Sequence, residues 1–253
     1  MTEAIANIRR EIEHAAEVAE TEFDDLADYV WKSVGLIEHE TRLELRKLTD
    51  YFPGRPDMQE FRWRHESRKL EGAFPFLIAQ GNLLCASTLF EIRLLLLATT
   101  VEPIAARKLS AIRGQGVERC FAFFDAVGVA HGRLPNWEQV SAALTIRNCV
   151  VHSGGALQYS RDAERLRNIV KDRRFWTPEV RQRVRELVQS GRQERPDVTL
   201  FEHALLGERI VITNSYAHWV TSLFRDYFLN LCSSISATLR VDWPDDGNGT
   251  TPV

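Results

Sequence analysis

The stretch that decides the fold is 136–155, NWEQVSAALTIRNCVVHSGG. We predict one helix here, because Asn136 is a candidate N-cap with Gln139 three residues later and because Gly154 and Gly155 form a stop signal. At about 100° per residue, its apolar residues cover a wide arc of the helix surface. The residues of this arc are Trp137, Val140, Ala143, Leu144, Ile146, Val150 and Val151.

One charged residue, Arg147, projects into the middle of that apolar arc. A guanidinium that faces a core is costly unless an anion meets it. We therefore expect an anion site, and the anion is either a carboxylate of the same chain or a phosphate of a ligand. A narrow polar strip follows one margin of the arc and consists of Ser141, Thr145, Asn148 and His152.

Helical periodicity dominates the rest of the chain. Residues 2–50 repeat apolar side chains at spacings of three and four, which predicts a long amphipathic helix. Residues 76–98 are apolar nearly all round and predict the central, buried helix of a bundle. Further helices are expected at 58–72, 102–112, 117–127, 161–172, 177–189 and about 215–239, with Pro75 opening the helix that follows the first of these.

Two short apolar segments, 198–202 and 207–213, predict strands that pair as a hairpin. The predicted fold class is therefore all-α, a helical bundle with a long N-terminal helix and a small β-hairpin before the last helix. The expected organisation is an N-terminal helical extension (1–50), a helical domain (51–240) and a disordered tail (241–253).

The charge distribution is uneven although the net charge is only −3. Residues 1–50 carry thirteen acidic and six basic side chains, whereas residues 161–195 carry eleven basic and six acidic ones. A basic segment after the central helix is suited to hold an RNA backbone, and a solvated helix face is the alternative. The candidate RNA-binding residues are Arg165, Arg173, Arg174 and Arg181.

No cofactor or metal is expected. The four cysteines are scattered without CxxC or zinc spacing, and no HExxH pattern exists, so a reduced, cytoplasmic protein is predicted. No signal peptide is visible. The apolar segment 76–98 contains Glu91, Arg93 and other polar residues, so we expect a core helix and no membrane span.

The residues Arg147-Asn148-x-x-x-His152 form an Arg-x4-His pattern near the end of the predicted helix. Apolar neighbours, the glycine stop and an upstream apolar helix with Glu91 surround it. This combination resembles the signature of the HEPN superfamily, α-helical domains best known as metal-independent ribonucleases of defence and toxin systems. The resemblance covers residues 74–238 and implies a HEPN-like bundle in which Arg147, Asn148 and His152 are catalytic.

The resemblance also implies a homodimer whose paired motifs form a composite cleft, and RNA products with 2′,3′-cyclic phosphate and 5′-hydroxyl ends. The residues themselves suit that chemistry, because histidine transfers protons near neutral pH and the last helical turn favours a positive charge. Asn148 lies on the face of His152, whereas Arg147 lies about 140° away around the helix. One copy therefore does not easily aim both at one phosphate. Supporting roles are expected for Glu91, Ser87, Ser141 and Thr145.

Several interpretations stay open at this point. Arg147 can instead form a structural ion pair with Glu91, and His152 can instead cap its helix. The expected function is an endoribonuclease of a prokaryotic toxin or anti-phage system, with RNA as substrate and an antitoxin or defence-system protein as a further candidate partner. The alternatives are a non-catalytic scaffold that binds a nucleotide or a protein, and an interaction protein that works through its N-terminal helix.

Overall fold

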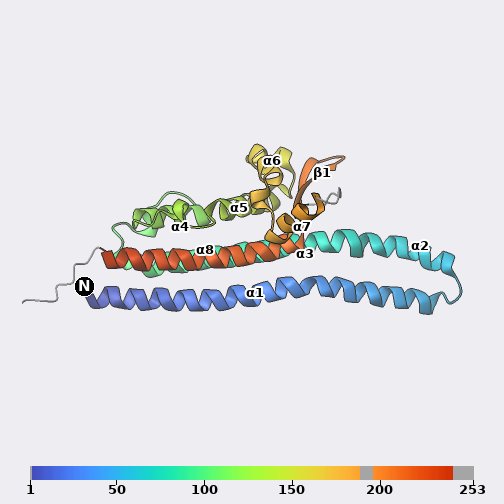
Figure 1. Cartoon of the computed structure of the whole chain (residues 1–253), viewed down its shortest axis with the longest axis horizontal. Helices are drawn as coiled ribbons and strands as arrows, with labels where there is room; N and C mark the ends of the chain where they lie inside the picture. The colour runs from blue at the N-terminus through green and yellow to red at the C-terminus, as the bar shows by residue number, and fades with distance from the viewer. Residues whose placement is uncertain (1, 189–195, 242–253) are drawn as a thin grey trace, which may run out of the picture. The chain divides into compact units, whose positions relative to one another are not determined.

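The computed structural model describes residues 2–188 and 196–241, and this part is all-α with one β-hairpin, as predicted (Figure 1). The helices are α1 (Thr2–Tyr51), α2 (Pro56–Ser67), α3 (Phe74–Val101), α4 (Gly116–Ala126), α5 (Trp137–Ser153), α6 (Ala163–Lys171), α7 (Pro178–Val188) and α8 (Asn214–Val241). The strands β1 (Val198–His203) and β2 (Gly207–Ile212) pair in antiparallel fashion.

The chain forms two compact units. Among the described residues, unit 1 combines 2–22, 89–137 and 225–241, and unit 2 combines 23–88, 138–188 and 196–224. The predicted boundary at residue 50 coincides with the end of α1, whereas the units divide α1 between residues 22 and 23. Residues 242–253 of the predicted tail lie outside the described residues.

The apolar stripe of α1 follows its predicted helical spacing as far as Val30. Ile8, Ile12, Ala19, Phe23 and Val30 are all buried, whereas Val34 is 40% exposed. Within unit 1, α1 is also tied to α3 by an ion pair in which Arg93 Nε lies 2.6 Å from Glu22 Oε2. The stripe of α1 therefore packs on its own chain.

A polar network crosses the interior of unit 2. Asn82 of α3 donates through Nδ2 to Ser33 Oγ (3.1 Å) and to Asn214 Oδ1 (2.7 Å). Asn214 Nδ2 in turn donates to the carbonyl oxygen of Val30 (2.7 Å). Because buried amides are costly unless they are hydrogen-bonded, this network fixes the contact of α1, α3 and α8 within the unit.

Two helix predictions are wrong. The predicted helix at 58–72 does not end before Pro75, because a π-helical segment, Arg68–Ala73, joins α2 to α3, and the N–H of Phe74 bonds to the carbonyl of Lys69. A π turn alters the hydrogen-bond spacing just before the proline, which has no N–H to give. The expected helix at 102–112 is replaced by two 3₁₀ turns, Glu102–Ile104 and Leu109–Ala111, because Ala105 and Lys108 have extended backbones.

The prediction that α3 is a buried central helix holds for only part of its surface. Ile92, Leu95 and Leu96 are 49%, 43% and 50% exposed, so one face of the helix is open. By length and composition alone, the helical stretch 56–104 is apolar enough to cross a membrane, and 39% of its most apolar window is buried inside the protein.

The predicted cap of α7 is confirmed. Thr177 Oγ1 accepts the N–H of Val180 (3.3 Å) and donates to Asp197 Oδ2 (2.6 Å). The other carboxylate oxygen, Asp197 Oδ1, accepts from Thr213 Oγ1 (3.1 Å). Asp197 is buried. It therefore connects the beginning of α7 with the open end of the hairpin, where β1 begins and β2 ends. Single 3₁₀ turns at His131–Arg133, Leu157–Tyr159 and Arg173–Phe175 complete the described elements.

Candidate functional site

Helix α5 carries the Arg-x4-His residues. Its C-terminal end is as predicted, whereas its N-terminal end is not. Asn136 precedes the helix with φ 65°, so it has a left-handed backbone and not the extended conformation usual for an N-cap. At the other end Gly154 (φ 57°) and Gly155 (φ 84°) stop the helix as predicted. The N–H of Gly155 donates to the carbonyl of Cys149 (3.1 Å).

The last turn of α5 is fixed to the hairpin. The carbonyl of Gly155 accepts the N–H of Ile210 (2.9 Å), and Arg209 Nε donates to the carbonyl of Gly154 (2.9 Å). A Cβ atom at Gly155 would lie 3.1 Å from the carbonyl oxygen of Ile210, so glycine permits this close approach. The turn that carries His152 is therefore held by strand β2.

The apolar arc predicted for α5 is buried in part but not throughout. Val140, Ala143, Ile146 and Val150 are buried as expected, but Val151 is 44% exposed. Arg147 is half-buried. Its guanidinium turns toward the neighbouring residue, where Nη1 donates to Asn148 Oδ1 (3.1 Å). The flexible side chain therefore places its charge on the side of Asn148, although helical angles put its Cα–Cβ bond elsewhere.

His152 completes this group one turn later. Four residues separate it from Asn148, which is a rise of about 6 Å along the same face of the helix. The imidazole is exposed and has no hydrogen-bond partner among the described residues. Within that part of the chain it does not act as a helix cap, and the exposed side chain is open to a ligand.

The three hydroxyl groups predicted to support the site form different hydrogen bonds. Thr145 Oγ1 donates to the carbonyl of Ser141 (2.7 Å), and Ser87 Oγ donates to the carbonyl of Leu83 (2.7 Å). Both are buried and bonded to their own helices, so they serve the fold. Ser141 Oγ instead accepts from Arg165 Nη2 of α6 (2.7 Å).

Two of the basic candidates contact α5: Arg165 through the hydroxyl of Ser141 and Arg174 through the carboxylate of Glu138. Arg174 is engaged by Glu138 (2.8 Å) and by Asp172, and its hydrogen bonds hold the pKa of Asp172 below the usual range. Arg173 lies over the ring of Trp176 (5.8 Å), and Arg181 is half-buried in α7. Residues 189–195 of the basic segment lie outside the described residues.

Glu91 lies in unit 1, against the first residue of α4. A Cβ atom at Gly116 (φ 51°) would overlap Glu91 Oε1, so the carboxylate sits at a helix N-terminus, where the peptide dipoles favour an anion. Burial raises the pKa of the nearby Cys120 thiol, and the charge of Glu91 adds to the effect. Arg147 belongs to unit 2, so the proposed ion pair between Glu91 and Arg147 stays a prediction.

One histidine pair was not found from the sequence. In unit 1, His131 Nδ1 lies 2.7 Å from Asp125 Oδ1, and the imidazole stacks on Phe121 with ring centroids 4.7 Å apart. Tyr227 donates its O–H to the carbonyl of His131 (3.0 Å). Six residues and a turn separate the two partners, so no helical or strand spacing indicated the pair. Its contacts serve to hold the loop that leads to α5.

Among the described residues, no group of three or more His, Cys, Asp or Glu side chains is placed to hold a metal ion. No protein-family model matches the chain, and neither a curated protein nor a solved structure gives a significant match. The residues of α5 and their surroundings are therefore the features of the protein that bear on its function.

Proposed function

We propose that this protein is a metal-independent endoribonuclease of a prokaryotic toxin or anti-phage defence system, acting in the cytoplasm as a homodimer. Arg147, Asn148 and His152 are the proposed catalytic residues. The observation that carries the proposal is an exposed imidazole one helical turn beyond a hydrogen-bonded arginine–asparagine pair.

The arrangement supports the chemistry in three parts. RNA cleavage without a metal needs a base for the 2′-hydroxyl, positive charge on the phosphate and a proton for the leaving oxygen. The accessible nitrogens of His152 suit the proton transfers. The guanidinium of Arg147 offers paired N–H donors of the kind that phosphate oxygens accept, and its Nη1 is hydrogen-bonded to Asn148, which lies on the helix face of His152.

In the proposed reaction the 2′-oxygen attacks phosphorus and its proton passes to His152. The bond between phosphorus and the 5′-oxygen then breaks, and the leaving 5′-oxygen takes up a proton. The products are a 2′,3′-cyclic phosphate and a 5′-hydroxyl. In a homodimer with a shared cleft, one His152 serves as the base and the second copy serves as the acid.

Arg165 is the proposed backbone-binding residue, because its hydrogen bond to Ser141 brings a second cation to the polar face of α5. From Ser141 to Asn148 the helix rises about 10 Å, so the two arginines would contact different phosphates of one strand. Arg174 is less suited, since carboxylates already engage it.

The proposal is tested by RNA cleavage in the presence of a chelator. We expect His152→Ala to lose about a hundredfold or more in rate, as removal of a general base does. Arg147→Lys is expected to lose rate as well, because lysine keeps the charge and lacks the paired donors. Arg165→Ala should weaken RNA binding more than Lys171→Ala, which removes an equal charge from an exposed position of the same helix.

Circular dichroism and a thermal melt of each variant would establish that the fold is kept. If His152→Ala and Arg147→Lys cleave at the rate of the unaltered protein, the assignment of these residues is wrong. If the unaltered protein binds RNA or a nucleotide without turning it over, the non-catalytic scaffold replaces the enzyme.

A further inference from the structure

Helix α3 exposes one uncharged face along its whole length. Its exposed residues are Phe74, Leu77, Gly81, Cys85, Thr88, Ile92, Leu95, Leu96 and Thr99. We call these residues the α3 stripe. Solvent-facing helix surfaces normally carry charged side chains, so an apolar stripe of this length indicates a contact surface.

The spacing of the α3 stripe is that of a coiled-coil seam. Apart from the adjacent pair Leu95 and Leu96, successive members lie three or four residues apart, and Gly81, Thr88 and Leu95 repeat every seven residues. At about 100° per residue the members fall within a sector of about 100°. The stripe lies on one uninterrupted helix, so helical geometry alone fixes these positions relative to one another. Such a surface fits another helix.

The sizes of the side chains along the α3 stripe indicate which helix packs against it. The middle of the first half carries small side chains (Gly81, Cys85, Thr88), and a Cβ built at Gly81 would have no atom within 4 Å apart from the adjoining backbone of its own helix. The second half is large (Ile92, Leu95), with exposed fractions of 49% and 43%. We propose that the stripe binds the stripe of a second copy of this chain in antiparallel fashion, with Thr88 on the two-fold axis.

In that register Gly81 faces Leu95 of the partner, and Cys85 lies one residue, about 1.5 Å along the axis, from the level of Ile92 of the partner. Each large side chain then enters the space beside a small one, at both ends of the symmetric contact. A parallel pair would instead set Leu95 against Leu95 and leave a gap beside Gly81. Antiparallel pairing is the arrangement that fills the surface.

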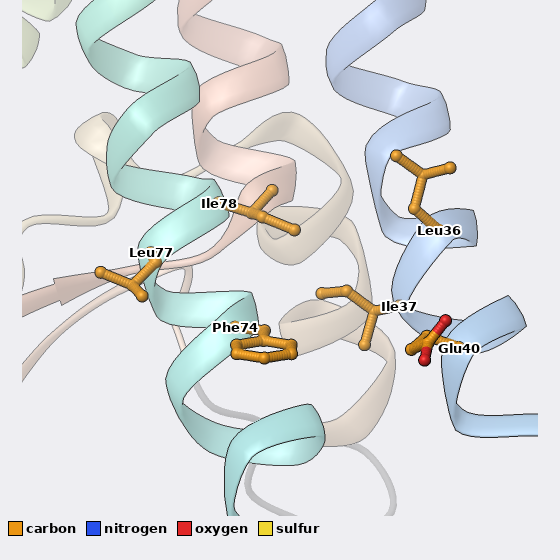
Figure 2. Close-up of a pocket in the computed structure, with 6 residues that line it drawn as sticks. All are labelled: Leu36, Ile37, Glu40, Phe74, Leu77 and Ile78. Atoms are coloured by element: carbon orange, nitrogen blue, oxygen red, sulfur yellow. The ribbon is translucent and has the colours of Figure 1, made fainter. Parts of the chain in front are cut away.

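A groove at the beginning of the stripe extends the surface. It has a volume of 250 Å³ and lies in unit 2 between α1 and α3, lined by Leu36, Ile37, Glu40, Phe74, Leu77 and Ile78. Figure 2 shows Ile37 of α1 and Ile78 of α3 pointing toward one another in it. In the antiparallel register this end receives the end of the partner's α3, near Thr99.

The area that the α3 stripe can bury determines how stable the proposed dimer is expected to be. A helix of 28 residues is about 42 Å long and about 10 Å across, which gives roughly 400 Å² for each copy. A stable interface commonly buries about 800 Å² for each partner. The dimer is therefore expected to dissociate on dilution.

A lipid bilayer is the less favoured occupant. The polar residues of α3 are engaged by protein, since Asn82 bonds to Ser33 and to Asn214, and Arg93 pairs with Glu22. Because its polar side chains bond to other helices, α3 has one exposed face for a partner and cannot be surrounded by lipid on all sides.

Cross-linking of single cysteines tests the arrangement in the full chain. Cys85 is exposed, whereas Cys120, Cys149 and Cys232 are buried; burial raises the pKa of all three thiols, that of Cys232 to about 12, which leaves little reactive thiolate. In a Cys85→Ser background, Thr88→Cys should form a dimer with a short bismaleimide. Leu95→Cys should not, because the two copies would lie about 21 Å apart along the axis.

A mixture of Gly81→Cys and Leu95→Cys chains should cross-link, although neither does so alone. Adding Ile92→Glu to the Thr88→Cys chain should abolish the dimer, whereas Leu205→Glu, at an 85% exposed residue of the hairpin turn, should not. The proposal is overturned if Leu95→Cys cross-links as well, which indicates parallel pairing. It is also overturned if Thr88→Cys stays monomeric, or if the unaltered chain instead floats with vesicles of zwitterionic and anionic phospholipid. None of these readouts depends on RNA cleavage.

Discussion

At the scale of single residues, Arg147 shows how far a long side chain can depart from its helical angle. Helical geometry set its Cα–Cβ bond about 140° from that of His152, yet its guanidinium donates to Asn148 on the histidine face. The Arg-x4-His spacing singled out the candidate residues, but it could not predict the direction of this side chain, because side-chain torsions depend on neighbours outside the helix.

Gly116 offers a test of the account of Glu91. We expect Gly116→Ala to lower the free energy of unfolding by about 2 kcal/mol, because alanine is strained at φ 51° and its Cβ overlaps the carboxylate. Gly35→Ala is the matched control. That glycine lies in α1 with open space around it, so alanine should add up to about 1 kcal/mol. Urea unfolding of both variants measures the difference, and a stabilising Gly116→Ala would contradict the account.

At the scale of elements, caps and strand patterns predicted the elements correctly, whereas the proline at the beginning of α3 suggested a break that is absent. The Thr177 cap and the two short strands were evident from residue types and spacing, and both are confirmed. Pro75 indicated the beginning of a helix, and α3 does begin beside it at Phe74, but a π-helical segment and not a break joins α3 to α2. The apolar composition of α3 suggested burial, yet composition does not reveal which face a neighbour covers.

Asp197 connects α7 to the hairpin, and this gives a prediction at the same scale. Asp197→Ala should lower the free energy of unfolding by about 3 kcal/mol, because the buried Thr177 loses a charged acceptor and the exposed Thr213 loses a hydrogen bond to the same carboxylate. Hydrogen exchange in α7 should rise as well. Thr199→Ala, in the same strand region, is the control and should change little. Equal effects of the two substitutions would show that the Asp197 network does not stabilise this region.

At the scale of the whole molecule, the fold class was predictable from periodicity, whereas the way the chain divides was not. Residues 2–51 form the long helix that their spacing indicates, but that helix contributes buried side chains to both units. The pattern of one helix cannot specify its partners, which are distant in sequence. For the site, spacing indicated the polar face of α5 but not the contact of Arg165 with Ser141, 24 residues away.

The role of α1 can be tested by truncation. Deleting residues 1–51 should prevent cooperative folding, because it removes Ile12, Phe23 and Val30 from the core. Loss of one buried phenylalanine side chain costs about 3–5 kcal/mol, and the total stability of a protein is about 5–15 kcal/mol. Deleting residues 1–7, before the first buried residue Ile8, should leave a cooperative melt. A truncated chain from residue 52 that melts cooperatively would show instead that α1 is a separable extension.

The central claim is that the exposed His152 performs proton transfer in RNA cleavage. The most direct measurement is analysis of RNA fragment ends after incubation with the unaltered protein and with His152→Ala, both in excess chelator. The account predicts fragments with 2′,3′-cyclic phosphate and 5′-hydroxyl ends from the unaltered protein, and their loss with the variant. The same fragments formed at the same rate by His152→Ala would contradict it.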